Sequence, residues 1–238
     1  MKTIENKTVA EVVAENIKTA HVFKKHGIDF CCGGGITIEK ACEKKQLDYQ
    51  MLKNELLQVN EAPKAYNYNS WKLDFLIDHI INVHHAYVEK SIPLILQYSN
   101  KVAKVHGHHY TEVVEINKLF TEVANELAAH LKKEEIILFP YIKKLLKYKN
   151  EDLELTKPPF ETVNNPIKMM EEEHETAGNI FKKIAKLTNN YTPPEGACNT
   201  FKALYAKLDE FEQDLHQHIH LENNILHPKA KELEQSFS

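Results

Sequence analysis

The stretch HLKKEEIILFP at residues 130–140 is similar to the stretch HIHLENNILHP at residues 218–228. Both stretches follow the pattern H-x-x-x-E-x-x-I-L-x-P, and they begin 88 positions apart. Upstream, His85 lies 45 residues before the first copy, and His174 lies 44 residues before the second. The chain therefore contains two related halves, each with a lone histidine followed by a His-x-x-x-Glu motif.

Helix geometry indicates what this repeated motif could do. Residues four apart lie on the same face of an α-helix, one turn from each other. His130 and Glu134 can therefore point at one centre, and so can His218 and Glu222. Apolar residues lie four before, three after and seven after His174, which favours an inward position for its side chain.

Two adjacent histidines compete for the remaining position. The residues four before, three after and seven after His85 are all apolar, whereas the same positions around His84 include a tyrosine and a serine. Periodicity therefore favours His85 as the inward side chain. The predicted ligand set is His85, His130, Glu134, His174, His218 and Glu222.

Six ligands are too many for one tetrahedral zinc ion and suit two ions. Imidazole and carboxylate together favour iron or manganese, and each glutamate could bridge the pair. The alternative is that a His-x-x-x-Glu pair is a solvated ion pair, but two copies at matching intervals favour the metal site. Glu126 and Asp214 each lie four residues before a predicted ligand. Either could contact a ligand from outside the site or relay protons, or could be an exposed charge.

The sequence around these motifs predicts an all-α fold. Apolar periodicity indicates four long helices, and no stretch shows the sustained alternation typical of strands. We expect a four-helix bundle over residues 70–238, with a kink at Pro93. The expected helices cover residues 71–100, 109–148, 167–187 and 197–233.

Residues 1–60 form a separate small helical module in this interpretation, joined to the bundle by a linker at residues 61–69. Thr8, Thr37 and Asp48 are candidate helix N-caps, and Gly27 is a candidate helix end. A module of about 60 residues is marginal by itself. We therefore expect it to dock on the bundle, in the same chain or across a dimer.

The module contains the stretch DFCCGGG at residues 29–35, with two adjacent cysteines. Cys31 and Cys32 could form a vicinal disulfide, bind iron in transit or exchange electrons with another thiol. A helix capped by Thr37 would place both near a helix N-terminus, which favours the thiolate. The alternative is a tight turn with a buried cysteine. Cys42 and Cys198 are predicted to be packing residues.

Composition limits the classes of partner. The formal net charge of −4 gives no reason to expect a nucleic-acid or anionic-membrane partner. No apolar run is long enough to cross a bilayer and the N-terminus lacks a signal-peptide pattern, so we expect a cytoplasmic protein. Histidine is abundant, with 14 in the chain. His216 and His220 should point away from the metal, and His106, His108 and His109 are expected in a surface loop.

The duplicated His-x-x-x-Glu motif resembles that of hemerythrin-like bundles. The stretch from TVAEVV to DFCCGGG resembles the cysteine module that precedes this bundle in the iron–sulfur cluster repair di-iron proteins. The resemblance covers nearly the whole chain. It implies a non-haem di-iron centre with oxo or hydroxo and carboxylate bridges, held by the six residues named above. It also implies a cytoplasmic, homodimeric protein of the nitric oxide and oxidative stress response.

Three functions are compatible with this resemblance. The first is repair of damaged iron–sulfur clusters, with iron supplied to client proteins. The second is reduction of nitric oxide or peroxide at the di-iron centre, and the third is oxygen binding or redox sensing. Reversible oxygen binding needs no thiols, so the two cysteines argue against a simple oxygen carrier. The sequence leaves open whether the protein is an enzyme.

Overall fold

The computed structural model describes residues 4–61 and 66–237. Within these ranges the chain is helical, and the only β-type pairing is an isolated bridge between Thr8 and Thr37. The predicted all-α class is confirmed. The chain divides into two compact units, one formed by residues 1–77, 145–156 and 216–238 and the other by residues 78–144 and 157–215.

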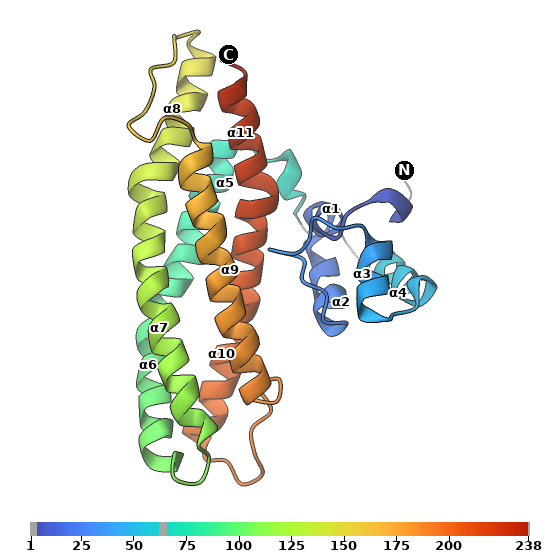
Figure 1. Cartoon of the computed structure of the whole chain (residues 1–238), viewed down its shortest axis with the longest axis vertical. Helices are drawn as coiled ribbons and strands as arrows, with labels where there is room; N and C mark the ends of the chain where they lie inside the picture. Colours follow the sequence, from blue (N-terminus) through green and yellow to red (C-terminus); the bar gives the residue numbers. More distant parts are fainter. Residues whose placement is uncertain (1–3, 62–65, 238) are drawn as a thin grey trace. The chain divides into compact units, whose positions relative to one another are not determined.

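The second unit contains the four long helices of the bundle (Figure 1). These are α6 (Ala86–His106), α7 (Glu112–Lys133), α9 (Asn164–Leu187) and most of α10 (Asn199–Leu221).

Aromatic residues from three of these helices form the centre of its core. The rings of Phe181 and Phe211 stack at 5.5 Å, and Phe120 meets Phe211 edge-on at 5.7 Å. Such pairs add to the free energy gained by burying their area. The predicted four-helix bundle is confirmed.

Three of the expected helices are interrupted by π-helical turns. The turns are η4 (Ile80–His85), η5 (Glu134–Leu138) and η6 (Glu222–Leu226), and they join α5 (Leu73–His79) to α6, α7 to α8 (Phe139–Asn150), and α10 to α11 (His227–Gln235). Pro93 lies inside α6, which continues past it to His106. A π-turn widens the helix locally and is often found at functional sites.

The N-terminal module is a set of short helices with strong local signals. It contains α1 (Val9–Glu15), α2 (Ala20–Lys25), α3 (Ile38–Lys45) and α4 (Tyr49–Glu61), with short turns η1 (Ile4–Asn6) and η2 (Ile17–Thr19).

The predicted caps of the module are confirmed. Thr8 and Glu11 form a reciprocal capping box, Thr37 caps α3, and the Asp48 carboxylate accepts from the backbone N–H of Met51 at 2.8 Å. Gly27 adopts a left-handed φ of 64° after α2, as expected of a residue that ends a helix.

The expected linker at residues 61–69 lies partly outside the described residues. Its described end forms the turn η3 (Tyr68–Ser70), in which Tyr68 is buried. The domain boundaries at residues 60 and 70 stay a prediction.

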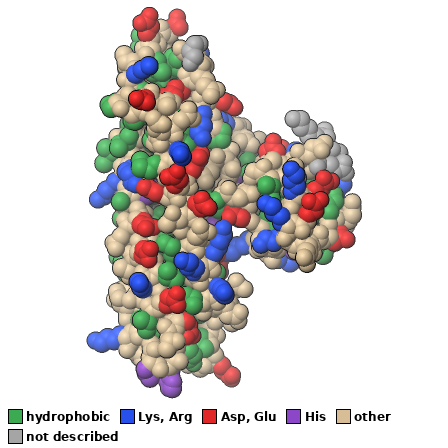
Figure 2. All heavy atoms as spheres, viewed as in Figure 1, with side chains coloured by type: hydrophobic (Ala, Val, Ile, Leu, Met, Phe, Trp, Pro, Cys, Tyr) green, Lys and Arg blue, Asp and Glu red, His purple; other side chains and the backbone are tan. Residues whose placement is uncertain are grey.

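Lysines and acidic residues are interspersed on the face shown in Figure 2, in keeping with the small net charge of −4. Across the described residues, every helix is too short or too polar to span a membrane.

Candidate metal centre

Four of the six predicted ligands lie in the second unit. His85 ends η4, His130 lies in α7, Glu134 begins η5, and His174 lies in α9. All four are buried, with at most 2% of their surface exposed. Glu134 approaches the Nε2 atoms of His85 and His130 at 3.4 Å each, and the Nε2 atoms of His130 and His174 are 3.0 Å apart.

The second copy of the motif reproduces this local geometry. His218 lies near the end of α10, and Glu222 begins η6, as Glu134 begins η5. His218 Nε2 and Glu222 Oε1 are 3.1 Å apart, and both side chains are buried. Each His-x-x-x-Glu motif therefore spans the junction between an α-helix and a π-turn, with both side chains on one face.

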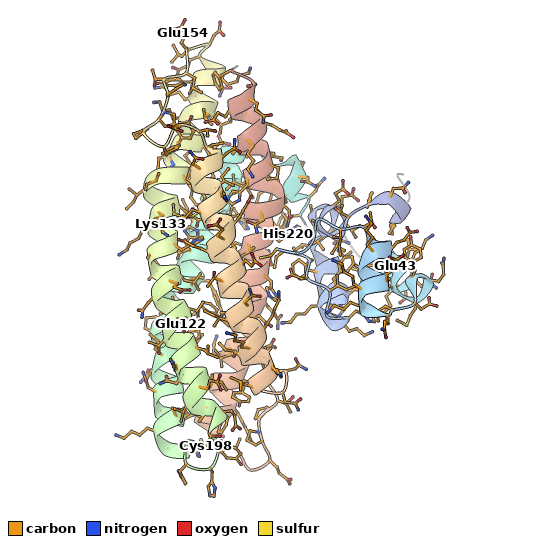
Figure 3. The ribbon with its side chains drawn as sticks, in the orientation of Figure 1. Glu43, Glu122, Lys133, Glu154, Cys198 and His220 are labelled. Carbon is orange, nitrogen blue, oxygen red and sulfur yellow. The ribbon has the colours of Figure 1, made fainter. Side chains whose placement is uncertain are left out.

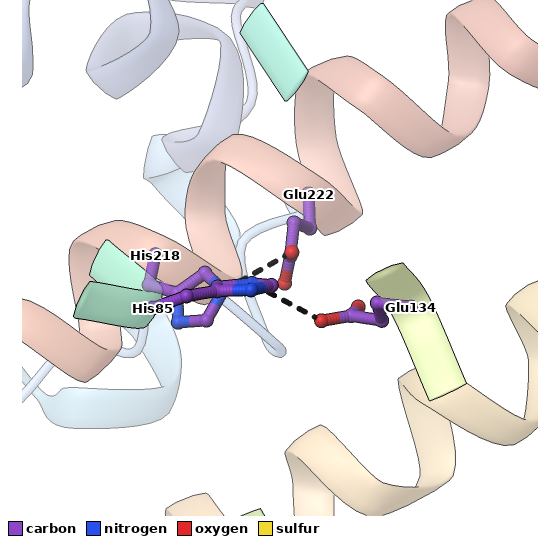
Figure 4. A group of neighbouring side chains, drawn as sticks. All are labelled: His85, Glu134, His218 and Glu222. Atoms are coloured by element: carbon purple, nitrogen blue, oxygen red, sulfur yellow. Dashed lines mark hydrogen bonds and ion pairs between the residues drawn. The ribbon is translucent and has the colours of Figure 1, made fainter. Parts of the chain in front are cut away.

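The six side chains fall into two groups that could each hold an ion. The ligand atoms of His85, Glu134, His218 and Glu222 all lie within 4.8 Å of one another (Figure 4). The same holds for the group His130, Glu134, His174 and Glu222. Both glutamates belong to both groups. The structure thus brings together all six predicted ligands, and periodicity chose His85 over His84 in agreement with this grouping.

Two further carboxylates contact the outer nitrogens of two predicted ligand histidines. Glu135 lies 2.7 Å from His85 Nδ1, and Glu173 lies 2.8 Å from His130 Nδ1. Lys133 forms an ion pair with Glu173. Such partners fix the ring orientation and leave Nε2 for the centre. Sequence reasoning missed both, although each directly adjoins a predicted ligand in the chain.

The charge of Glu173 follows from these contacts. Burial acts to raise the pKa of Glu173, but hydrogen bonds from Lys133 and His130 and their positive charge outweigh it. Its pKa therefore lies below the ordinary value, and the side chain is a carboxylate at neutral pH.

The two carboxylates expected beside the ligands lie elsewhere. Glu126 is exposed on α7. Asp214 contacts His84 Nδ1 at 2.9 Å rather than a ligand histidine. His84 is itself buried. It is adjacent in the chain to the predicted ligand His85, but neither His84 nor Asp214 belongs to either ligand group.

The chemistry of the donor set fits metal binding. Two fully buried carboxylates converge on four buried imidazoles. The chain contains no arginine, and no lysine is buried among the described residues. Buried carboxylates need a compensating charge, and cations coordinated by the nitrogen and oxygen donors would supply it.

The Cys31–Cys32 stretch forms a loop organised by Asp29. Asp29 Oδ1 accepts from the backbone N–H groups of Cys31, Cys32 and Gly33 at 3.1–3.2 Å. The Cys31 thiol also donates to Asp29 Oδ1 at 3.2 Å. Both cysteines are free thiols in the structure, Cys31 buried and Cys32 half-buried.

The expected stabilisation of the thiolate is wrong for Cys31. Thr37 does cap α3, but the sulfur faces an acidic side chain. A hydrogen bond with Cys32, burial and the charge of Asp29 raise the pKa of the Cys31 thiol well above its ordinary value. Cys31 is therefore protonated at neutral pH.

Gly34 explains part of the glycine run. A Cβ atom at Gly34 would lie 2.3 Å from the carbonyl oxygen of Phe30, too close for any other residue in this conformation. The Gly34 carbonyl accepts from the N–H of Ala10 at 2.8 Å, and that of Ile36 accepts from Val9 at 3.0 Å. The loop thus satisfies two free N–H groups in the first turn of α1.

Of the two cysteines predicted to be packing residues, one is confirmed and the other is wrong. Cys42 is buried in α3, as predicted, but Cys198 is exposed, which corrects its assignment as a packing residue. Its sulfur lies 3.3 Å from His106 Nε2.

His216 and His220 do not belong to either ligand group, as expected. Both rings meet Phe30 at 5.8 and 6.0 Å between centroids. Figure 3 labels His220, which lies near the end of α10. Burial lowers the pKa of His220 to about 4, so its imidazole is neutral at physiological pH.

Comparisons with known proteins identify the families that the chain resembles. The Hemerythrin HHE cation binding domain matches residues 76–230, and the ScdA_N family, described as a domain of unknown function (DUF542), matches residues 5–60. The chain is 36% identical over 213 residues to the iron-sulfur cluster repair protein YtfE of Escherichia coli O157:H7, covering 90% of this chain and 91% of that protein. The protein of that name from Shigella boydii serotype 4 (strain Sb227) gives the same values. The resemblance inferred from the two motifs is thereby confirmed: the chain belongs to the hemerythrin HHE cation-binding family and, over most of its length, to the family of the YtfE proteins.

Proposed function

We propose that the chain holds two non-haem iron ions and repairs iron–sulfur clusters damaged by nitrosative or oxidative stress, by supplying iron. The observation that carries this proposal is that Glu134 and Glu222 belong to both ligand groups. Two ions that share two carboxylates, each with two imidazoles of its own, would use all six buried side chains.

In this proposal His85 and His218 would hold one ion, and His130 and His174 would hold the other. Glu134 and Glu222, which belong to both groups, would be shared by the two ions. When bound, the two ions supply iron that can change oxidation state and can be released to an acceptor. Nitrogen and carboxylate ligands suit iron, and the absence of cysteine from both groups speaks against a thiolate-held ion.

The residues around the ligands have separate tasks. Glu135 and Glu173 orient two imidazoles, and burial of all six side chains excludes water from the centre. Cys31 and Cys32 are the candidate thiols for passing iron or electrons. Since Cys31 carries its proton at neutral pH, the half-buried Cys32 is the better candidate for first contact with a client.

The names of the relatives support repair as the purpose of this chemistry. The YtfE proteins are named iron–sulfur cluster repair proteins. For this chain we infer damaged iron–sulfur proteins as clients, a cytoplasmic location and a homodimeric assembly.

The test is anaerobic incubation of the iron-loaded protein with a cluster-free client protein and sulfide. We expect iron to appear in the client and to leave the repair protein in equal amount. A parallel incubation adds nitric oxide and an excess of a chemical reductant. Nitrous oxide formed there over many turnovers, with no iron reaching the client, would replace this proposal by the nitric oxide reductase alternative. A client that remains cluster-free while the protein keeps its iron would contradict the repair function.

A further inference from the structure

The loop that carries the two thiols is attached to the turn η6, within the same compact unit. The side-chain amide of Asn224 donates to the carbonyl of Cys31 at 3.1 Å and to that of Phe30 at 3.5 Å. Because carbonyl oxygens only accept, these contacts fix which end of the amide faces the loop. The same nitrogen lies 3.1 Å from His220 Nδ1. Asn224 therefore joins the loop to both η6 and α10.

Phe30 strengthens the attachment beside the first thiol. Its ring is buried and packs edge-on against the imidazoles of His216 and His220. Asp29 accepts from the N–H groups of the loop, while Asn224 donates to its carbonyls. The backbone at Cys31 is thus fixed at both its polar groups.

Asn224 lies close in the chain to the predicted ligand Glu222. It lies two residues after Glu222, in the turn that Glu222 begins. Side chains two apart on a helix point in widely different directions. Glu222 can therefore belong to the ligand groups while Asn224, only two residues further along the same turn, contacts the thiol loop.

The repeated motif offers an internal comparison. The residue equivalent to Asn224 in the first copy is Ile136, which is 72% exposed. An isoleucine cannot donate to a carbonyl. The second copy thus differs from the first at the side chain that contacts the loop.

We propose that Asn224 is a positioning residue that holds the Cys31–Cys32 loop in register with the turn that begins at the metal ligand Glu222. It keeps Cys31 covered while the loop is attached. Detachment of the loop is then the step that exposes this thiol. The consequence for repair rests on the proposed function, whereas the attachment itself does not.

The test measures alkylation of each cysteine in the full-length, iron-loaded protein under anaerobic conditions. Cys31 and Cys32 are resolved by fragmentation of their shared peptide. Exposed Cys198 gives a fast reference rate. Cys42, buried in the same module, reports any general unfolding of that module.

Three substitutions separate hydrogen bonding from packing. Asn224→Asp keeps the shape but puts an acceptor against two carbonyls, and Asn224→Ile copies the first repeat. Asn223→Asp makes the same charge change at the adjacent position and is the matched control. We expect both Asn224 variants to alkylate at Cys31 about tenfold faster, as loss of one such hydrogen bond implies, with Cys42 unchanged.

An unchanged Cys31 rate in both Asn224 variants overturns the proposal. Equal acceleration of Cys31 and Cys42 also overturns it, because Asn224 would then support the whole module rather than the loop. An equal effect of Asn223→Asp, with no effect of Asn224→Ile, overturns it as well, because the added charge and not the lost contact would then be responsible. Client repair measured on the same samples separates the two claims, since absence of repair by the unsubstituted protein contradicts the proposed function alone.

Discussion

The turns η5 and η6 arise from the same repeated pattern, but their outer surfaces differ. Both begin with a fully buried glutamate that belongs to both ligand groups. In η5 the next apolar residues are open to solvent, with Ile136 72% and Ile137 44% exposed. In η6 the residue equivalent to Ile137, Ile225, is 1% exposed. Both copies thus keep the buried glutamate of the ligand groups, while the outer surface of the second copy contacts another element of the chain.

That element is the N-terminal module, which contacts η6 through α1 and the thiol loop. The comparison separates two roles that could be confused in a single-copy site. The first role, proposed metal binding by the buried glutamate, belongs to both turns. The second role, attachment of the Cys31–Cys32 loop, belongs to η6 alone.

The largest expected effect tests the shared role. Glu134→Ala and Glu222→Ala each remove a carboxylate common to both ligand groups. We expect each variant to lose much or all of the second iron, and the losses to be similar, because the ligand sets are related by the repeat. Elemental analysis after anaerobic iron loading measures this, with Glu126→Ala as an exposed control on α7. A loss confined to one of the two variants would mean that the carboxylates are not shared.

The sequence was sufficient to find the six side chains that the structure brings together, because their signal is local and repeated. Residues four apart on a helix face one direction, and the repeat identified the helices that carry the lone histidines. The caps at Thr8, Thr37 and Asp48 were equally accessible, since a cap is decided within a few residues. These features depend on short-range geometry.

The missed features depend on contacts between distant segments or on departures from α-helical period. No residue pattern indicated the π-turns. On a regular α-helix Ile137, seven residues after His130, would lie on the same face as His130, yet it is 44% exposed. Glu173 meets His130 across two helices, which periodicity along one helix does not reveal. The raised pKa of Cys31 depends on its hydrogen bond with Cys32, its burial and the charge of Asp29, all of which follow from the fold of the loop.

The second prediction concerns the role found only at η6. Replacing Cys31 and Cys32 together by serine should leave iron binding intact, because neither belongs to a ligand group. Repair of a client should fall severely. Iron analysis and client reconstitution measured on the same sample check this, with Cys198→Ser as the exposed-thiol control. Normal repair by the double variant would make the thiols structural, and loss of iron would add them to the metal site.

A smaller effect is expected from Glu135 and Glu173, the carboxylates that contact the Nδ1 atoms of two predicted ligand histidines. Glu173→Gln removes the charge that orients His130, and Glu135→Gln does the same for His85. We expect each to weaken iron binding by about 10–100-fold, as is usual for such partners. Competition with a chelator measures the affinity, and Glu172→Gln, next to Glu173 and exposed, is the control. Affinities equal to that control would show that the rings need no such support.

The smallest expected effect concerns the module itself. Hydrogen bonds from Lys25 and His26 lower the pKa of Glu55. A carboxyl whose pKa is lowered by folding stabilises the folded state above its unfolded pKa of about 4.3, and this stabilisation disappears as the pH falls through the folded value. Glu55→Gln should therefore slightly increase hydrogen exchange in α4 at pH about 7 and have no effect in strong acid. A difference that persists in acid would point to packing instead of charge.

The central claim is that the two copies of the motif build one dinuclear site. X-ray absorption at the iron edge, combined with an iron count on the anaerobically loaded full-length protein, tests it most directly. We expect two irons per chain, nitrogen and oxygen neighbours only, and an iron–iron vector of about 3.5–4 Å, the usual spacing of two-metal sites. One tightly held iron per chain without an iron–iron vector would contradict the claim.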